Sequence, residues 1–170
     1  MPIPANASKY RTKPNKPLIA RETVSKFKAP KQNLYKLGDA QFVGLIQLGV
    51  SAKDADLVMR SFTTMPNAEL WRALNIAAST IDRKVKANEI LAPDQSERVL
   101  GLRRLLDQVK HMVAESGNTE GFNAEEWMAT WLRQPNAGLA GRAPAEFLGT
   151  VTGQHMVSKL LLQMQTGAYA

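Results

Sequence analysis

The sequence contains no cysteine, only two histidines, and no apolar run long enough to cross a membrane. The absence of cysteine excludes disulfide scaffolds, thiol catalysis and cysteine-rich zinc sites. His111 and His155 lie far apart and neither has a partner at ligand spacing, so we expect no metal centre. A membrane-spanning helix needs about 20 consecutive apolar residues. Without such a run, we expect no membrane-spanning helix and no membrane partner.

Positive charge is unevenly distributed over the chain. Residues 1–36 hold nine lysines and arginines against the single acid Glu22, a net charge of +8, whereas residues 37–170 hold thirteen against fourteen acids, a net charge of −1. Five prolines interrupt the basic stretch, so we expect an irregular N-terminal arm over residues 1–36. Such an arm either neutralises the phosphates of a polyanion or is a solvated, disordered tail, and composition favours neither reading.

From Asp39 onward the spacing of apolar residues is helical and no stretch alternates with a period of two. This pattern predicts an all-α fold. The break Ser116-Gly-Asn-Thr-Glu-Gly121 predicts a boundary between two modules, residues 37–116 and 122–170. The expected helices cover 39–48, a segment capped by Ser51, Pro66 to Leu74, 78–87, Pro93 to about Glu115, a segment capped by Asn123, Pro144 to Leu148, and about 153–166.

Motifs for catalysis are missing. Neither common glycine-rich phosphate loop is present, and there is no Gly-x-Ser-x-Gly elbow. No spacing pairs a serine or a carboxylate with a histidine, and we interpret His111 and His155 as surface or boundary residues. The sequence therefore gives no positive argument for an enzyme, and we predict no catalytic residue and no cofactor.

The segment around Leu74-Asn-Ile76 fits the turn of a helix-turn-helix unit. Such a unit needs a tight turn after its first helix, and asparagine is second only to glycine in tolerating the left-handed backbone conformation. Apolar residues on both sides of the turn would form the core that the two helices share, and the opposite face of the second helix carries hydroxyls and long cations suited to phosphates and base edges. The residues predicted to contact DNA are Ser79, Thr80, Arg83, Lys84 and Lys86. An ordinary helical hairpin with a solvated charged face is the alternative.

Two sets of residues resemble a known family. Ile76-Ala-Ala-Ser-Thr-Ile-Asp-Arg83 with Leu91-Ala-Pro-Asp-Gln-Ser-Glu-Arg-Val99 resembles the Xre-type helix-turn-helix of toxin–antitoxin antitoxins. The second module resembles, more strongly, the toxin-binding domain shared by Xre, ParS and MbcA antitoxins, which neutralise RES-domain toxins. The residues that carry this second resemblance are Trp131-Leu132, Pro135-Asn136-Ala137, Leu139, Gly141, Pro144, Leu148, Thr150, Gly153, Val157, Leu160 and Gly167-Ala-Tyr-Ala170.

The resemblance implies a bacterial cytoplasmic antitoxin of a type II system, associated with the nucleoid when it is bound to operator DNA. One module binds the operator and represses the operon, and the other covers the active site of a RES-type, NAD-depleting toxin. Because helix-turn-helix proteins bind palindromes as dimers, we expect a homodimer within a toxin–antitoxin hetero-oligomer. In the toxin-binding module, the last helix and the tail are the expected contact region, with Arg142, Lys159 and Tyr169 as toxin-binding residues.

Two other functions fit parts of the sequence. The chain could be a stand-alone helix-turn-helix transcription regulator whose C-terminal module only dimerises. Alternatively, residues 1–36 could make it a basic accessory protein that binds RNA or nucleoid DNA without sequence preference. A neighbouring reading frame for a RES-domain protein would favour the antitoxin, whereas steep salt dependence without a preferred operator would favour the accessory protein.

Overall fold

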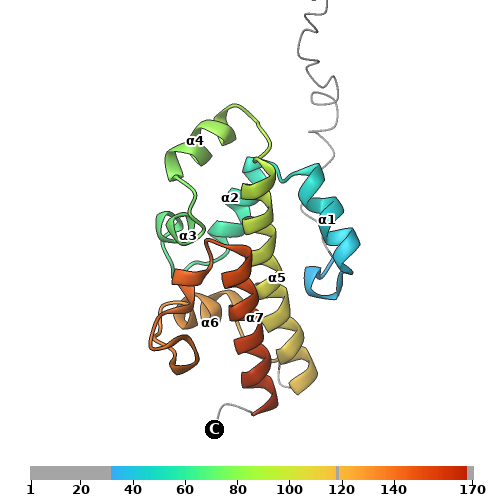
Figure 1. The fold of residues 1–170 in the computed structure, drawn as a ribbon, viewed down its shortest axis with the longest axis vertical. Helices are drawn as coiled ribbons and strands as arrows, with labels where there is room; N and C mark the ends of the chain where they lie inside the picture. Colours follow the sequence, from blue (N-terminus) through green and yellow to red (C-terminus); the bar gives the residue numbers. More distant parts are fainter. Residues whose placement is uncertain (1–31, 118, 168–170) are drawn as a thin grey trace, which may run out of the picture.

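The computed structural model describes residues 32–117 and 119–167, and over these residues the chain is all-α, as the sequence predicted. Figure 1 shows the arrangement of the helices. The α-helices are α1 (Asp39–Leu48), α2 (Ala52–Arg60), α3 (Asn67–Ala73), α4 (Ala78–Lys86), α5 (Pro93–Ser116), α6 (Ala124–Trp131) and α7 (Val151–Thr166). Three short 3₁₀ helices accompany them, η1 (Leu34–Lys36), η2 (Ala137–Leu139) and η3 (Pro144–Phe147). No helix in the described part of the chain is long and apolar enough to span a bilayer.

Helix α5 is the central element, and η1, α1, α6 and α7 all pack against it (Figure 1). Pro93 occupies its first turn, where the missing N–H costs nothing, and Gly117 ends it with a φ of 77°. Both boundaries agree closely with the sequence prediction. The residues Val99, Leu102, Leu106 and Val109 form its buried stripe.

A single hydrophobic core runs through both predicted modules. Leu70 and Leu74 from the first module and Leu148 and Leu160 from the second belong to the same buried cluster, and α3 of the first module contacts η3 of the second directly. The segment 116–121 therefore does not separate two cores. The division of the chain into a DNA-binding and a toxin-binding part remains a prediction about function.

Buried amides join α5 to α7. Gln154 donates through Nε2 to the backbone oxygens of Arg98, at 3.0 Å, and Leu148, at 2.8 Å. Its side chain lies where a Cβ on Gly101 would be, so only glycine leaves room for it in α5. Two turns further along, the amide of Gln108 donates to the Ser158 carbonyl and accepts from the Ser158 hydroxyl. These polar contacts fix the register of the two helices more specifically than apolar packing alone.

The N-terminal arm ends earlier than predicted. Residues 1–31 of the arm lie outside the described residues, but Leu34–Lys36 form η1, and the Leu34 side chain is buried against α5. The Leu34 N–H donates to the buried carboxylate of Asp107 at 2.8 Å. The charge and proline content of the arm does not predict this contact, because only one apolar residue, Leu34, is buried in it. The prediction of an irregular arm was therefore wrong for Leu34–Lys36.

The loop between α6 and η3 places an alanine in a conformation that favours glycine. Gly138 lies inside η2, and Ala140 takes the left-handed conformation with φ 54°. Gly141 follows at 78°. An alanine in this conformation is strained, and the strain persists because the Ala140 and Gly141 N–H groups donate to the Ala137 and Asn136 carbonyls.

Candidate functional site

The turn between α3 and α4 has the geometry that the sequence predicted. Asn75 takes the left-handed conformation, with φ 54°, between the end of α3 and the start of α4. Trp71, Leu74, Ile76 and Ile81 are buried around it. The shared core of the two helices is thus present, and the opposite face of α4 is turned to solvent.

Four of the five predicted DNA-contacting residues lie on the open side of α4. Ser79, Arg83 and Lys86 are exposed, and Thr80 is half-buried beside them. Asp82 shares this face. Within the described residues, the Lys86 side chain has no salt-bridge or hydrogen-bond partner. The N-cap position of α4 is Ala77, whose side chain accepts no hydrogen bond, so the backbone N–H groups of the first turn have no side-chain cap.

Lys84 differs from the other four because its ammonium group turns back to the loop before α5. Its Nζ lies 3.1 Å from the Glu89 carboxylate and 3.0 Å from the Ile90 carbonyl oxygen, and its side chain is 15% exposed. The hydrogen bond from Lys84, with a second from Arg83, holds the pKa of Glu89 below its ordinary value. Lys84 is therefore placed to hold the α4–α5 loop. Arg83 reaches the same carboxylate from a side chain that is 63% exposed, which leaves it accessible to a ligand.

The predicted toxin-contacting residues are dispersed. Arg142 lies between η2 and η3, where its Nε bonds the Glu146 carboxylate at 3.0 Å and its guanidinium lies 4.7 Å from the centre of the Phe147 ring. The Ala143 N–H, and then Arg142, hold the pKa of Glu146 below its ordinary value. Lys159 is exposed on α7, and no ion pair of the described residues includes it. Tyr169 lies outside the described residues.

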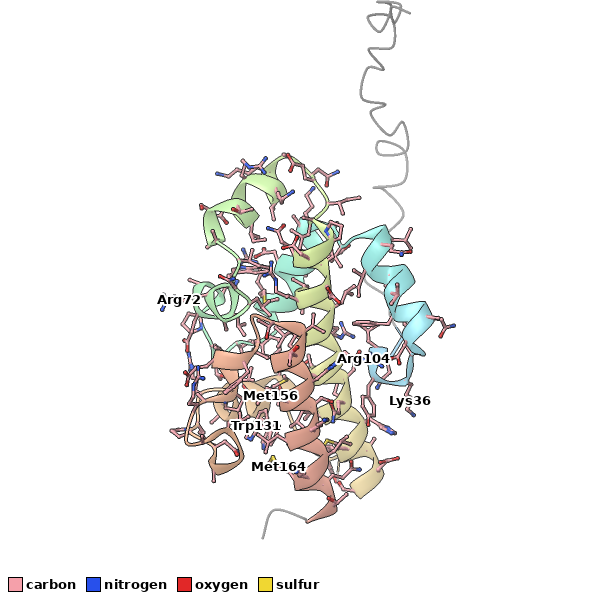
Figure 2. The ribbon with its side chains drawn as sticks, viewed as in Figure 1. Lys36, Arg72, Arg104, Trp131, Met156 and Met164 are labelled. Carbon is pink, nitrogen blue, oxygen red and sulfur yellow. The ribbon has the colours of Figure 1, made fainter. Side chains whose placement is uncertain are left out.

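Sequence reasoning missed the exposed apolar side chains of α7. They are Val151, Met156, Leu162 and Met164, each between 36% and 43% exposed. Figure 2 shows Met156 and Met164 along α7. Methionine in a helix usually fills gaps in a core, so the pattern alone favoured burial. The sequence could still have indicated them, because α7 contains more apolar residues than the buried side of one helix can hold.

This set of side chains, which we call the α7 apolar face, is suited to a protein partner. Four of the eight large apolar side chains that are exposed in the described chain belong to this one helix. At 3.6 residues per turn these side chains lie on more than one side of α7, with Val151 and Leu162 together and Met156 and Met164 further round the helix. Exposed apolar surface marks interaction sites, and methionine adapts to partners of irregular shape.

A cavity of about 230 Å³ lies between η1, α1, α5 and α7. It contains His155 and the carboxylates of Asp39 and Glu97, and Arg104 bonds Asp39 at 3.2 Å. His111 lies outside it, 3.2 Å from Glu115. Among the described residues, no three histidines or carboxylates lie close enough to hold a metal ion. The hydroxyl of Ser158, which also lines the cavity, donates to the side-chain oxygen of Gln108.

The described residues thus combine a charged outer face on α4 with exposed apolar side chains on α7. Comparison with known proteins identifies the family. Residues 119–167 match the family model of the antitoxin Xre/MbcA/ParS C-terminal toxin-binding domain. The Prs ADP-ribosylating antitoxin of Sphingobium sp. (strain YBL2) is 40% identical over 137 residues, which cover 81% of this chain and 86% of that protein.

A second relative is more distant. Antitoxin Xre of Yersinia enterocolitica serotype O:8 / biotype 1B (strain NCTC 13174 / 8081) is 26% identical over 129 residues, which cover 75% of this chain and 80% of that protein. The chain belongs to the Xre/MbcA/ParS family of antitoxins. The resemblance inferred from the sequence is confirmed, and the family match includes the whole of the α7 apolar face.

Proposed function

We propose that this antitoxin neutralises a RES-type, NAD-consuming toxin by direct binding through α7 and the segment that follows it, and that it represses its own operon by binding operator DNA through α4. The α7 apolar face carries the first half of the proposal, because it lies within the residues that match the toxin-binding family. Apolar surface removed from water contributes about 25 cal/mol per Å², and a protein partner is the simplest way to cover it.

The toxin's chemistry is suggested by a relative. The name of the Sphingobium protein links that antitoxin to ADP-ribosylation of Prs. ADP-ribosylation takes ADP-ribose from NAD, so an NAD-consuming toxin fits both that name and the RES-type resemblance. A concave pocket that admits NAD is inhibited most simply by a segment that covers it. Tyr169 is an aromatic residue suited to anchor such a segment, and Arg142 and Lys159 supply charges for carboxylates around the pocket.

Operator binding is supported by the α3–α4 geometry. Asn75 closes the turn and leaves Ser79, Thr80, Arg83 and Lys86 on the accessible side of α4. Short hydroxyls and long cations at successive turns match the phosphates and base edges of a major groove. Two-fold symmetric operators require two copies of the unit, so a homodimer within the toxin complex belongs to the same proposal.

Co-expression with the candidate toxin encoded beside this gene tests the first half. We expect the two chains to co-purify, and cells that carry both to grow where the toxin alone arrests them. Removing residues 167–170 asks whether the tail is inhibitory: a truncated chain that still rescues cells would place the inhibition on α7 alone. Measuring cellular NAD and ADP-ribosylated Prs in parallel distinguishes NAD hydrolysis from ADP-ribose transfer.

A stand-alone regulator is the second candidate, because the α7 apolar face is equally able to pair two copies of this chain. In that case the purified protein would be a dimer through α7, and no toxin would bind it. The size of the purified chain, measured alone and with Met156→Glu, separates the two functions. A dimer that this variant dissociates, together with failure to capture the toxin, would favour the regulator.

A further inference from the structure

A shallow hollow of about 560 Å³ lies beside the α3–α4 turn. It is lined by Ala68, Arg72, Asn75, Ile76, Ala77 and Ala78. Three of these side chains are single methyl groups and Ile76 is 5% exposed, so little projects into the hollow except Arg72 and Asn75. A group of phosphate size can reach the backbone of the turn without displacing a large side chain.

Arg72 is the only arginine in the described chain whose guanidinium has no hydrogen bond and no ion pair. The other seven each bond a carboxylate: Arg60, Arg83, Arg98, Arg103, Arg104, Arg133 and Arg142. The acid nearest to Arg72 in α3 is Glu69, and Arg133 occupies its carboxylate at 2.6 and 3.0 Å. Arg72 and Glu69 attract each other electrostatically, but the Glu69 carboxylate is already bonded by Arg133. The exposed Arg72 guanidinium is therefore available to an outside anion.

The position of Arg72 relates it to the predicted recognition helix. Figure 2 shows Arg72 at the outer edge of α3, and the hollow that it lines extends to Ala78, the first residue of α4. Ser79, the next residue, is exposed. A duplex that places a groove along the open side of α4 therefore brings one of its phosphate strands over the hollow.

We propose that Arg72 binds a backbone phosphate of the operator, with the hollow receiving the phosphate while α4 reads the bases. This inference rests on the proposed operator binding. Guanidinium groups bind phosphate bidentately, and such contacts set affinity and register without reading sequence. Arg72 is therefore an affinity residue, unlike Arg83, which we expect to carry sequence preference.

The experiment measures binding of the full chain to two duplexes of equal length at several salt concentrations. One duplex carries the sequence upstream of the gene, and the other has the same composition in scrambled order. Arg72→Ala should lower affinity for both by about tenfold and reduce the slope of log K against log salt by about 0.9, the value for one phosphate contact. The preference for the upstream duplex should not change, and Arg72→Lys should restore most of the slope.

Lys159→Ala is the matched control. It removes one exposed charge without an ion-pair partner in the described chain, from α7 and not from the basic arm or the α3–α4 unit. An unchanged slope for Arg72→Ala, or equal changes for both variants, would overturn the inference. Equal binding of the two duplexes by the unaltered chain would instead count against operator recognition while the slope still tests the phosphate contact. Binding to neither duplex would overturn both. Unchanged melting temperatures verify that the variants are folded.

Discussion

The outer faces of α4 and α7 differ in the chemistry that they offer to a partner. On α4, every exposed side chain except that of Ala78 is polar or charged, and none of the exposed large apolar residues of the described chain lies there. On α7, four such residues are exposed, and the only ionisable side chains are those of His155 and Lys159. A charged face remains hydrated and attracts a polyanion at long range, whereas an apolar face gains free energy only on contact.

The comparison also shows how one small chain carries both faces. Helices α4 and α7 do not rest on separate cores, because α5 belongs to the cluster that supports each of them. A change to the shared scaffold should therefore affect both binding activities. A change to either outer face should affect one activity only. The predictions below use this distinction.

The largest effect is expected from Gly153→Ala. Gly153 lies in the first turn of α7, and a Cβ there would overlap the backbone carbonyl of Phe147 at the end of η3. Backbone cannot move aside as a flexible side chain does, so we expect the free energy of unfolding to fall by about 3 kcal/mol and both binding activities to decline together. Denaturant unfolding measures the loss.

Gly44→Ala is the matched control for Gly153→Ala. Gly44 is also a helical glycine, but a Cβ there would have no heavy atom within 4 Å. Removing the flexibility of glycine within a helix should raise stability by about 0.5–1 kcal/mol. If Gly153→Ala were as well tolerated as Gly44→Ala, the scaffold under α7 would not be closely packed.

The double variant Met156→Glu/Met164→Glu tests the α7 apolar face. Two carboxylates in a desolvated interface should weaken toxin binding by at least about 2 kcal/mol, the scale of an interface hot spot. Because both side chains are exposed in the free protein, stability and operator affinity should be unchanged. Titration calorimetry with the toxin measures the effect. Gln163→Glu adds one charge to an exposed polar position between them, and an equal loss there would show that charge alone matters.

Arg83→Ala tests the α4 face, and here operator binding and not toxin binding should be lost. If Arg83 reads a base, operator binding should weaken by about 1–3 kcal/mol while toxin binding is retained. Losing Arg83 also removes one of the two cations that hold Glu89, but Lys84 keeps its own bond to that carboxylate. The loop should therefore stay in place. Unchanged operator affinity in both Arg83→Ala and Lys86→Ala would contradict the assignment of α4 as the recognition helix.

These faces were not equally predictable from the sequence. The turn at Asn75 was predicted correctly because a local rule governs it: few residues other than glycine tolerate positive φ. Helix boundaries at Pro93 and Gly117 follow from local rules as well. The α7 apolar face was missed, because a sequence shows which residues are apolar but not which of them the fold leaves uncovered.

Long-range contacts account for the remaining differences. The Leu34 contact with Asp107 joins residues 73 positions apart, and no composition rule predicts it. The same holds for Ala140, whose left-handed conformation is imposed by hydrogen bonds of its loop and not by its own preference. The shared core escaped prediction because glycine-rich segments such as 116–121 break helices without necessarily separating cores.

The smallest effect concerns the contact between α3, which precedes α4, and the chain just after α6, which leads to α7. Arg133, just after α6, bonds Glu69 in α3 with two hydrogen bonds and donates a third to the Thr64 carbonyl at 2.9 Å. The hydrogen bond from Arg133 lowers the pKa of Glu69 below its ordinary value of 4.5. A carboxylate whose pKa is lowered by folding stabilises the folded state above its unfolded pKa, and that contribution is lost as pH falls through the folded pKa.

A double-mutant cycle with Glu69→Gln and Arg133→Gln should therefore give a small favourable coupling at pH 7 that fades at pH values below 4.5. Both side chains are more than one-third exposed, so solvent and salt screen the pair and the coupling should be the weakest of the effects predicted here. A coupling that persisted at low pH would mean that the hydrogen bond to Thr64, which needs no carboxylate, carries the contact. A large coupling at pH 7 would mean that the joint between the two regions is an element of stability in its own right, and the α4 and α7 faces would then respond to each other's partners.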